Sequence, residues 1–298
     1  MSTTSRYVVG IDLGTTHSVM AYLDTSLLTE EGPSPVPQLF AVPQVVLPGQ
    51  VEARPLLPSF LYLSSPTDFP ARALDLPWPS GQNRSSVVGE LARQHGGQVP
   101  MRLVSSAKSW LAYDGVDRTA AILPYAAPSD GPDAVPKVSP VDASARYLAH
   151  LKDAWDERMP GFPLGEQEVL ITVPASFDQV ARELTVRAAQ AAGLPKVTLL
   201  EEPQAAFYAW LGRHPRSWRD LLRVGDVVLV CDVGGGTTDF SLISVADQAG
   251  NLTIERIAVG DHILLGGDNM DLMLAMSVGK RLEREGHKLE PWQRRQLL

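Results

Sequence analysis

Two copies of one short pattern, about two hundred residues apart, constrain the fold of this 298-residue chain more than any other feature. In each copy an apolar run ends at an aspartate, a Gly/Thr turn follows, and a second apolar run returns. The copies are Asp12–Ser18 and Asp232–Asp239. Apolar runs joined by a short glycine-containing turn predict a β-hairpin. The duplication predicts two related lobes with a cleft between them, and its period is far too long for a solenoid.

The residue types in both turns suit a bound polyphosphate. Glycine lets the backbone approach a ligand closely, and threonine hydroxyls add hydrogen-bond donors. The candidate phosphate ligands are Gly14, Thr15, Thr16, Gly234, Gly235, Gly236, Thr237 and Thr238. Asp12 and Asp232, at strand ends, suit a Mg²⁺ ion that keeps its waters. Neither turn is a Walker A loop, because no Gly-Lys-Ser/Thr follows. Two ordinary tight hairpins are the alternative, and the repeated aspartate favours the phosphate site.

Between the hairpins, strand and helix patterns alternate, which predicts an α/β fold with a mixed sheet. Ser139 before Pro140 predicts the start of a helix whose apolar positions include Leu148 and Trp155. Ser176 with Gln179 resembles a capping box and opens a helix with Val180, Leu184, Ala188 and Ala191 on one face. Other expected elements are an edge strand within Leu39–Leu47, strands Ser59–Leu63, Val169–Val173 and Val197–Leu200, and helices Val87–Gln94 (closed by Gly96-Gly97), Pro203–Leu211 and Asn269–Arg284.

Composition narrows the partners and the compartment. A net charge of −8 argues against a nucleic-acid partner. The single cysteine, Cys231, has apolar neighbours, is expected to be buried in a strand, and indicates a reducing compartment. No signal peptide pattern and no apolar run of about 20 residues is found, so we expect a cytoplasmic protein without a membrane partner. The histidines outside the first hairpin (His95, His150, His214, His262 and His287) show no metal-ligand spacing.

Several motifs together resemble one family. Gly10–Ser18 is similar to the first phosphate loop of the DnaK-type, 70-kilodalton heat-shock chaperones, and Asp232–Asp239 to their second. The stretches that resemble other segments of that family are Pro58–Phe60, Ala107–Trp110, Ile171–Phe177, Glu202–Ala206 and Val259–Asp268. The resemblance implies an actin-like ATPase fold with ribonuclease H-like duplicated lobes and mixed five-stranded sheets. It also implies ATP/ADP and Mg²⁺ as ligands, with co-chaperones (a J-domain protein and a nucleotide exchange factor) and client polypeptides as partners of a full-length chaperone.

The resemblance also implies residue roles. Lys108 would reach the γ-phosphate and orient the attacking water, although a surface lysine is the alternative. Glu202 would lie near the metal waters and couple the lobes, and Thr237 would contact the γ-phosphate. The expected catalytic residues are therefore Lys108, Glu202, Asp232, Thr237 and Asp239, and Asp12 and Asp232 would hold Mg²⁺ through water. Gly266 and Gly267 are expected either beside the nucleotide or in a simple turn.

The chain departs from the family pattern in places. His17 replaces the residue usual after the threonines and could touch phosphate or face solvent. Asp268 and Asn269 stand where the family has Glu and Asp. The adenosine-holding helix and a later glycine-rich loop have no counterpart. We expect a first lobe over residues 1–221, with an outer subdomain over about 38–138, and an incomplete second lobe over 222–298.

Three other classes of protein share parts of this pattern. A filament-forming bacterial actin homologue such as MreB has a segment like Glu201–Ala206 and a similar Gly-Gly-Gly-Thr-Thr loop. A sugar-kinase-like phosphotransferase would need an acceptor-positioning acid, and none is recognised. A nucleotide-gated interaction module without hydrolysis fits the missing segments. The residues around Ala175–Phe177 and Lys108 favour the chaperone family.

Overall fold

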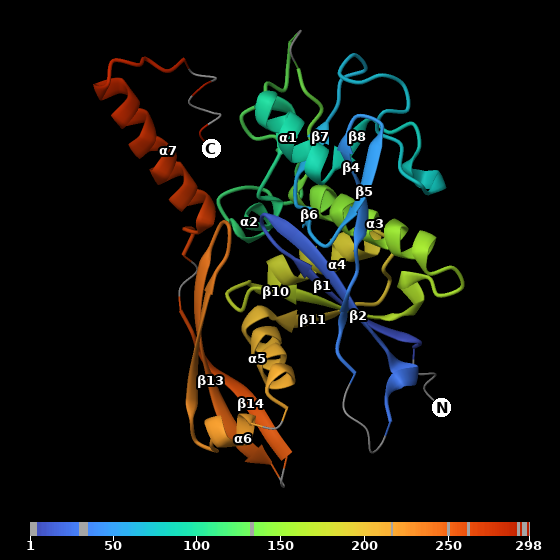
Figure 1. The fold of residues 1–298 in the computed structure, drawn as a ribbon, viewed down its shortest axis with the longest axis vertical. Coiled ribbons are helices and arrows are strands. Elements are labelled where there is room, and N and C mark those ends of the chain that lie inside the picture. The colour runs from blue at the N-terminus through green and yellow to red at the C-terminus, as the bar shows by residue number, and fades with distance from the viewer. Residues whose placement is uncertain are drawn as a thin grey trace.

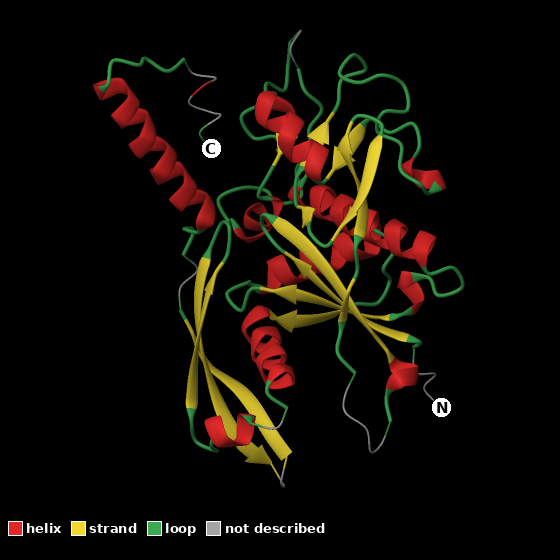
Figure 2. Ribbon diagram, in the orientation of Figure 1, coloured by secondary structure: helices red, strands yellow, loops and turns green. Residues whose placement is uncertain are grey.

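The computed structural model describes residues 5–29, 35–131, 134–215, 217–248, 251–260 and 263–290, together with residues 293 and 297. A large sheet lies at the centre, and a second sheet stands beside it, next to the helix labelled α5 (Figure 1). Helices α3 and α4 pack on the large sheet, and smaller elements lie beyond α3 (Figure 2). The fold is thus a mixed α/β arrangement, as the sequence predicts.

The large sheet has six strands, five of them in the order β11-β10-β1-β2-β3, with β6 also paired to β2. Their bounds are β1 Tyr7–Leu13, β2 His17–Asp24, β3 Gln38–Leu39, β6 Leu57–Pro58, β10 Glu168–Val173 and β11 Thr198–Glu201. β1, β10 and β11 are parallel, whereas β2 is antiparallel to β1. The mixed sheet is confirmed. Val9 and Ile11 are fully buried in β1, so the strand that carries the first turn is anchored in the core.

Three helices flank the last two strands of the large sheet in sequence: α3 Pro140–Arg158 before β10, α4 Gln179–Ala191 after it and α5 Glu202–Arg213 after β11. Ser139 caps α3 in a capping box with Asp142, as expected for the Ser-Pro start. The predicted cap of α4 is wrong, because Asp178 accepts the hydrogen bond of the Ala181 amide at 2.6 Å. The buried face of α4 is also shifted. Leu184 and Ala188 are buried as expected, whereas Val180 and Ala191 are exposed. The buried face of the helix includes Ala181 in place of Val180.

The segment between β3 and α3 forms two further small sheets. Its elements are β4 Val42–Leu47, β5 Gln50–Arg54, β7 Leu61–Leu63, β8 Ser86–Val88, β9 Leu103–Val104, α1 Glu90–Gln98 and α2 Ala107–Ala112. The expected edge strand within Leu39–Leu47 is present as β4, which pairs with β5 in a hairpin. The expected helix start at Val87 is wrong, because Val87 lies in β8. Gly89, at φ 97°, separates that strand from α1, and α1 then continues through Gly96 because this glycine packs under the Leu103 side chain.

The second sheet is antiparallel in the order β12-β13-β14, with β12 Val227–Val233, β13 Thr238–Gln248 and β14 Asn251–Val259. Phe207 of α5 packs against Ile243 and Val245 of β13. Short helix α6, Trp218–Leu221, precedes β12, and α7, Gly267–Arg284, confirms the predicted C-terminal helix. Single-turn 3-10 helices cover Thr25–Leu27, Pro79–Gly81, Pro100–Arg102 and Leu164–Glu166.

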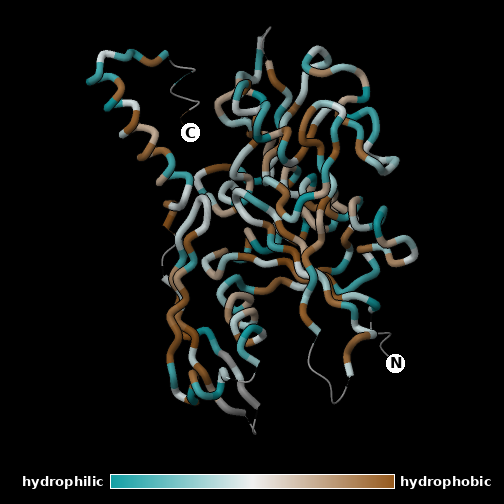
Figure 3. The backbone as a smooth tube through the Cα atoms, viewed as in Figure 1, coloured by the Kyte–Doolittle hydropathy of each residue, from teal (hydrophilic) through white to brown (hydrophobic). Residues whose placement is uncertain are grey.

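Cys231 is exposed, contrary to the expectation of burial. Side chains alternate along β12, and Cys231 lies on the same face as Leu229 and Val233, which are 61% and 51% exposed. Figure 3 shows hydrophobic residues along this sheet as well as along the large one. The apolar neighbours of Cys231 in the sequence therefore did not predict its burial, because the burial of a side chain depends on which other elements pack over that face of the strand. None of the described helices is both long and apolar enough to cross a bilayer.

Candidate active site

The two Gly/Thr turns meet face to face. The first turn joins β1 to β2 and the second joins β12 to β13. Gly235 lies against the side chain of Thr16, and a Cβ added to Gly235 would overlap it. A Cβ added to Gly236 would lie 2.9 Å from Thr15 Cγ2 and 3.1 Å from Ser109 Oγ. The close approach of the two hairpins therefore requires glycine at both positions. The structure brings together predicted residues from distant parts of the sequence.

Each turn is also tight within itself. A Cβ added to Gly14 would overlap the carbonyl oxygen of His17, so the first turn leaves no room for a side chain there. In the second turn the Gly234 amide donates to the carbonyl of Thr237 at 2.8 Å. Backbone groups in such turns can point toward an anion, because the strands on either side fix their direction.

The segment before α7 is fastened to the second turn. The Gly267 amide donates to Gly234 O at 2.9 Å, and the Asp268 amide donates to Gly235 O at 2.8 Å. The hydroxyl of Thr238 donates to Leu265 O at 2.8 Å. Thr238 therefore holds this segment in place, whereas the sequence suggested that its hydroxyl faces phosphate. The neighbouring Asp261 and His262, which belong to the motif Val259–Asp268, lie outside the described residues.

Carboxylates gather beside the turns. Asp12 at the end of β1 accepts a hydrogen bond from Thr172 Oγ1 of β10 at 2.9 Å. Asp232 and Asp239 are direct partners across the β12–β13 hairpin. Burial raises the pKa of the Asp232 carboxyl; nearby Lys108 opposes this shift, while Asp239 and Asp12 add to it. The three aspartates thus form one electrostatic group, and their mutual repulsion favours binding of a cation.

Lys108 and Glu202 form an ion pair at the same place. Lys108 is in the first turn of α2, which begins after Ser106 in a left-handed conformation with φ 55°. Its Nζ donates to Glu202 Oε1, and the two side chains are only 11% and 17% exposed. Burial raises the pKa of the Glu202 carboxyl, although the Lys108 ammonium opposes the shift. Asp12 and Asp232 raise this pKa further, so both lie near Glu202.

Two neighbours of these residues, Ser109 and Thr172, were not predicted as site residues, whereas His17 and Asn269 were singled out in the sequence. Ser109 faces Gly236, and Thr172 orients Asp12. Asn269 Oδ1 accepts a hydrogen bond from the Gly266 amide at 2.9 Å. Nδ1 of the half-buried His17 lies 3.3 Å from Thr16 Oγ1. A polar Thr172 inside the apolar strand Val169–Val173 was a usable signal. The position of Ser109 depends on a contact between distant segments.

The residues present fit a nucleotide phosphate group and a hydrated metal ion. Glycine at positions 235 and 236 lets the two turns touch, and the half-buried carboxyls of Glu202 and Asp232 lie near Lys108. Among the described residues, no group of three His, Cys, Asp or Glu side chains is placed to hold a metal directly. The carboxylates of Asp12 and Asp232 are of the type that could hold the waters of a hydrated Mg²⁺ ion.

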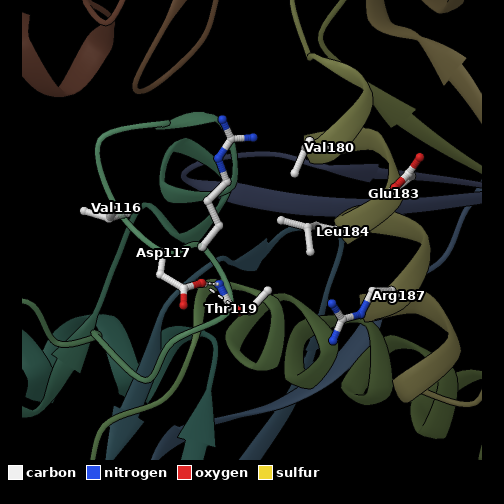
Figure 4. Close-up of a pocket in the computed structure, with 8 residues that line it drawn as sticks. Val116, Asp117, Thr119, Val180, Glu183, Leu184 and Arg187 are labelled. Atoms are coloured by element: carbon white, nitrogen blue, oxygen red, sulfur yellow. Dashed lines mark hydrogen bonds between the residues drawn. The ribbon is translucent and has the colours of Figure 1, made fainter.

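A separate cavity of about 450 Å³ lies between the loop at residues 116–119 and α4 (Figure 4). Val180 and Leu184 point toward it from α4, and Asp117 bonds Thr119 on the opposite rim. It is lined by none of the predicted phosphate-site residues. Arg118, another lining residue, is already engaged in a two-oxygen pair with Asp178. We therefore place the candidate site at the two turns.

Comparison with known proteins decides the family. The family model described as Hsp70 protein matches residues 81–292. This chain belongs to the Hsp70 family. The membership confirms the resemblance drawn from the motifs and, with it, the actin-like ATPase fold. The two turns that resemble the family's phosphate loops in sequence lie in contact with each other.

Curated relatives within the Hsp70 family are chaperone proteins named HscA. A homologue from Acidithiobacillus ferrooxidans is 34% identical over 301 residues, covering 98% of this chain and 40% of the relative. One from Pseudomonas fluorescens is 32% identical over 274 residues, covering 91% and 37%. HscA of Photorhabdus laumondii is 31% identical over 304 residues, covering 98% and 41%. The chain thus spans about two fifths of the length of these relatives.

Proposed function

We propose that this chain binds MgATP between the two turns and hydrolyses it, as the nucleotide-binding part of an Hsp70-type chaperone. The observation that carries the proposal is the contact of Gly235 and Gly236 with Thr16 and Thr15, beside the Lys108–Glu202 pair. If the two hairpins were independent structural turns, they would not need to contact each other at positions where only glycine fits. Membership of the Hsp70 family agrees with this function and does not favour a filament-forming actin homologue.

The residues take the following roles in the proposal. Backbone amides of both turns, with Thr15, Thr16 and Thr237, bind the phosphates, and Asp12 and Asp232 hold the waters of Mg²⁺. The metal supplies positive charge that offsets the charge of the phosphates. Lys108, released from Glu202, donates to the γ-phosphate and orients the attacking water. Asp239 and Glu202 help to order water at the same point, and Gly266 and Gly267 keep the second turn in place.

The same proposal includes the organisation of the chain and its partners. We place the boundary between the lobes at residues 221/222, with residues 38–138 as an outer subdomain and 222–298 as part of a second lobe. A J-domain protein, a nucleotide exchange factor and client polypeptides are the partners expected of the full chaperone, in the cytoplasm. Direct binding of purified candidates would test each of these partners separately.

The decisive experiment compares Lys108→Ala with a matched surface substitution, Lys196→Ala. Calorimetry with MgADP and MgATP measures binding, and phosphate release in single turnover measures hydrolysis. We expect Lys108→Ala to bind MgADP within about threefold of the original chain but to lower hydrolysis at least ~10²-fold, because positioning and charge stabilisation supply the rate. Lys196→Ala, on an exposed loop, should change neither.

Each contrary result removes a defined part of the proposal. Absence of nucleotide binding by the original chain refutes it entirely. Binding without any phosphate release leaves a nucleotide-gated module, and unchanged turnover in Lys108→Ala removes Lys108 from the mechanism. Growth of light scattering on addition of ATP would instead indicate a filament-forming protein.

A further inference from the structure

One carboxylate lies between two arginines, one on helix α4 beside the large sheet and one on β14 of the second sheet. Glu201 ends β11 and is the residue before α5. Its Oε1 accepts from Arg182 Nη2 of α4 at 2.9 Å, and Arg256 Nε of β14 lies 2.7 Å from its Oε2. The Glu201 side chain is only 12% exposed. The Oε2 contact lacks the direction of a hydrogen bond, so Arg256 acts there by charge. We name Arg182, Glu201 and Arg256 the clasp.

The side of the clasp on the large sheet is rigid. Arg182 Nε also donates to the carbonyl of Phe177 at 3.2 Å, which fixes the guanidinium near the start of α4. That helix start is held by Asp178, whose carboxylate caps the helix and pairs with Arg118. Glu201 itself is the residue directly before α5, so the start of that helix fixes its backbone. The Glu201 carboxylate is therefore held in a fixed position next to Arg256 of β14.

The other side of the clasp leads back to the second phosphate turn. Arg256 is the register partner of Ile243 in β13, and β13 begins at Thr238, directly after the turn. Ile243 packs against Phe207 of α5. This apolar contact is non-directional and lets the sheets slide, whereas the charged contact with Glu201 favours one orientation. Both contacts involve α5 or the residue that precedes it.

The clasp is next in sequence to the catalytic centre of the proposed function. Glu202, whose carboxylate pairs with Lys108, directly follows Glu201. A rotation of the second sheet that lengthens the Arg256–Glu201 contact would also move the second turn away from Thr15 and Thr16. We propose that Glu201 is a positioning residue: through Arg256 it sets the orientation of the second sheet, and hence the spacing of the two phosphate turns. This inference rests on the proposed function for its effect on nucleotide binding.

The test separates the clasp from a general loss of stability. In a Cys231→Ser background, spin labels at Glu157→Cys of α3 and Lys280→Cys of α7 report the distance between the two parts of the chain. Both positions are exposed. We expect Arg256→Gln and Glu201→Gln each to broaden the distance distribution, while Arg256→Lys retains most of the original one. Glu285→Gln, which breaks the exposed pair with Arg281 in α7, is the matched control and should change nothing.

Nucleotide affinity gives the second readout. Arg256→Gln should weaken MgADP binding about threefold, the effect of one partly exposed ion pair. The double variant with Glu201→Gln should be no weaker than Glu201→Gln alone, because both remove the same contact. Melting temperatures identify a variant that is merely unfolded.

Two outcomes would overturn the inference: unchanged distance distributions in both single variants, or effects on the distance that simply add. The distance measurement needs no nucleotide, because the clasp consists of protein side chains alone. If the original chain fails to bind nucleotide, the proposed function falls, while the distances still decide whether Glu201 sets the orientation of the sheet.

Discussion

Two adjacent glycines before α7 should respond differently to the same substitution. An ideal Cβ on Gly266 would lie 2.5 Å from the carbonyl oxygens of both Gly234 and Gly235, which are backbone atoms that cannot rotate away. An ideal Cβ on Gly267 would meet nothing closer than 3.7 Å. Gly267→Ala is therefore a matched control for Gly266→Ala, one residue away and with identical chemistry. The sequence treats the two positions alike, so the contrast comes from the structure alone.

The magnitude follows from the bonds that the clash would break. Relief of the overlap requires the segment before α7 to move away from the second turn, which lengthens the hydrogen bonds from the Gly267 and Asp268 amides. Two such bonds contribute about 2 kcal/mol together. Because 1.4 kcal/mol corresponds to tenfold in an equilibrium constant, we expect roughly thirtyfold weaker MgADP binding in Gly266→Ala. Gly267→Ala should stay within about threefold.

Two measurements check this expectation. Calorimetric titration gives the MgADP affinity of both variants at a temperature well below their melting points. Hydrogen exchange of the amides at positions 267 and 268 reports the two bonds without any ligand, and only Gly266→Ala should lose protection there. Retained protection and affinity in Gly266→Ala, or equal losses in both variants, would refute the steric reasoning.

Three further predictions concern stability and the site. Burial lowers the pKa of His150 to about 4 from its usual 6.5, so between those pH values the unfolded chain takes up a proton that the folded chain does not. The unfolding free energy should therefore fall by about 3 kcal/mol as the pH drops from 6.5 to 4. Urea titrations at several pH values should show a smaller pH dependence in His150→Gln. Leu151→Ala in the buried face of α3 should cost about 2–5 kcal/mol of unfolding free energy, against less than about 0.5 for Val180→Ala, whose side chain is 51% exposed; equal losses would contradict the assigned core. Thr172→Val removes the hydroxyl bonded to Asp12 and should weaken MgADP binding about threefold with little change in melting temperature, whereas an unchanged affinity would separate Thr172 from the site.

Local chemistry explains what could be predicted from the sequence. Both hairpins, the mixed sheet, the Ser139 cap and the last helix depend on turn residues and periodicity within short windows. Errors arose where two local signals competed. Ser176 and Asp178 are both good caps two residues apart, and Asp178 prevails because it caps the helix while pairing with Arg118. Val87 and Val88 stand before Gly89, a glycine at positive φ, so this β-branched pair belongs to β8 and the helix begins only after the glycine.

Long-range contacts explain what could not be predicted. The exposure of Cys231 depends on which elements cover β12, and no pattern within the strand contains that information. Ser109 faces Gly236 across 127 positions of sequence, and Thr238 uses its hydroxyl on Leu265. A hydroxyl beside a glycine turn can serve a phosphate or the fold equally well. Its role is decided only once the partner carbonyl is in place.

The aspartates of the site come from both hairpins, so the charge repulsion between them acts across the contact of the two turns. Burial raises the pKa of both Glu202 and Asp232, with further raising by Asp12 and Asp232 at Glu202 and by Asp239 and Asp12 at Asp232. Lys108 is the cation that opposes both shifts. Like charges at this spacing push the strands that carry them apart. The glycine contacts between the turns and the Glu201–Arg256 pair oppose that repulsion. Added divalent cation should therefore draw the two sheets together even before nucleotide binds, and the same spin-label pair would show that shift as a narrower distribution with Mg²⁺ than with K⁺ at equal ionic strength.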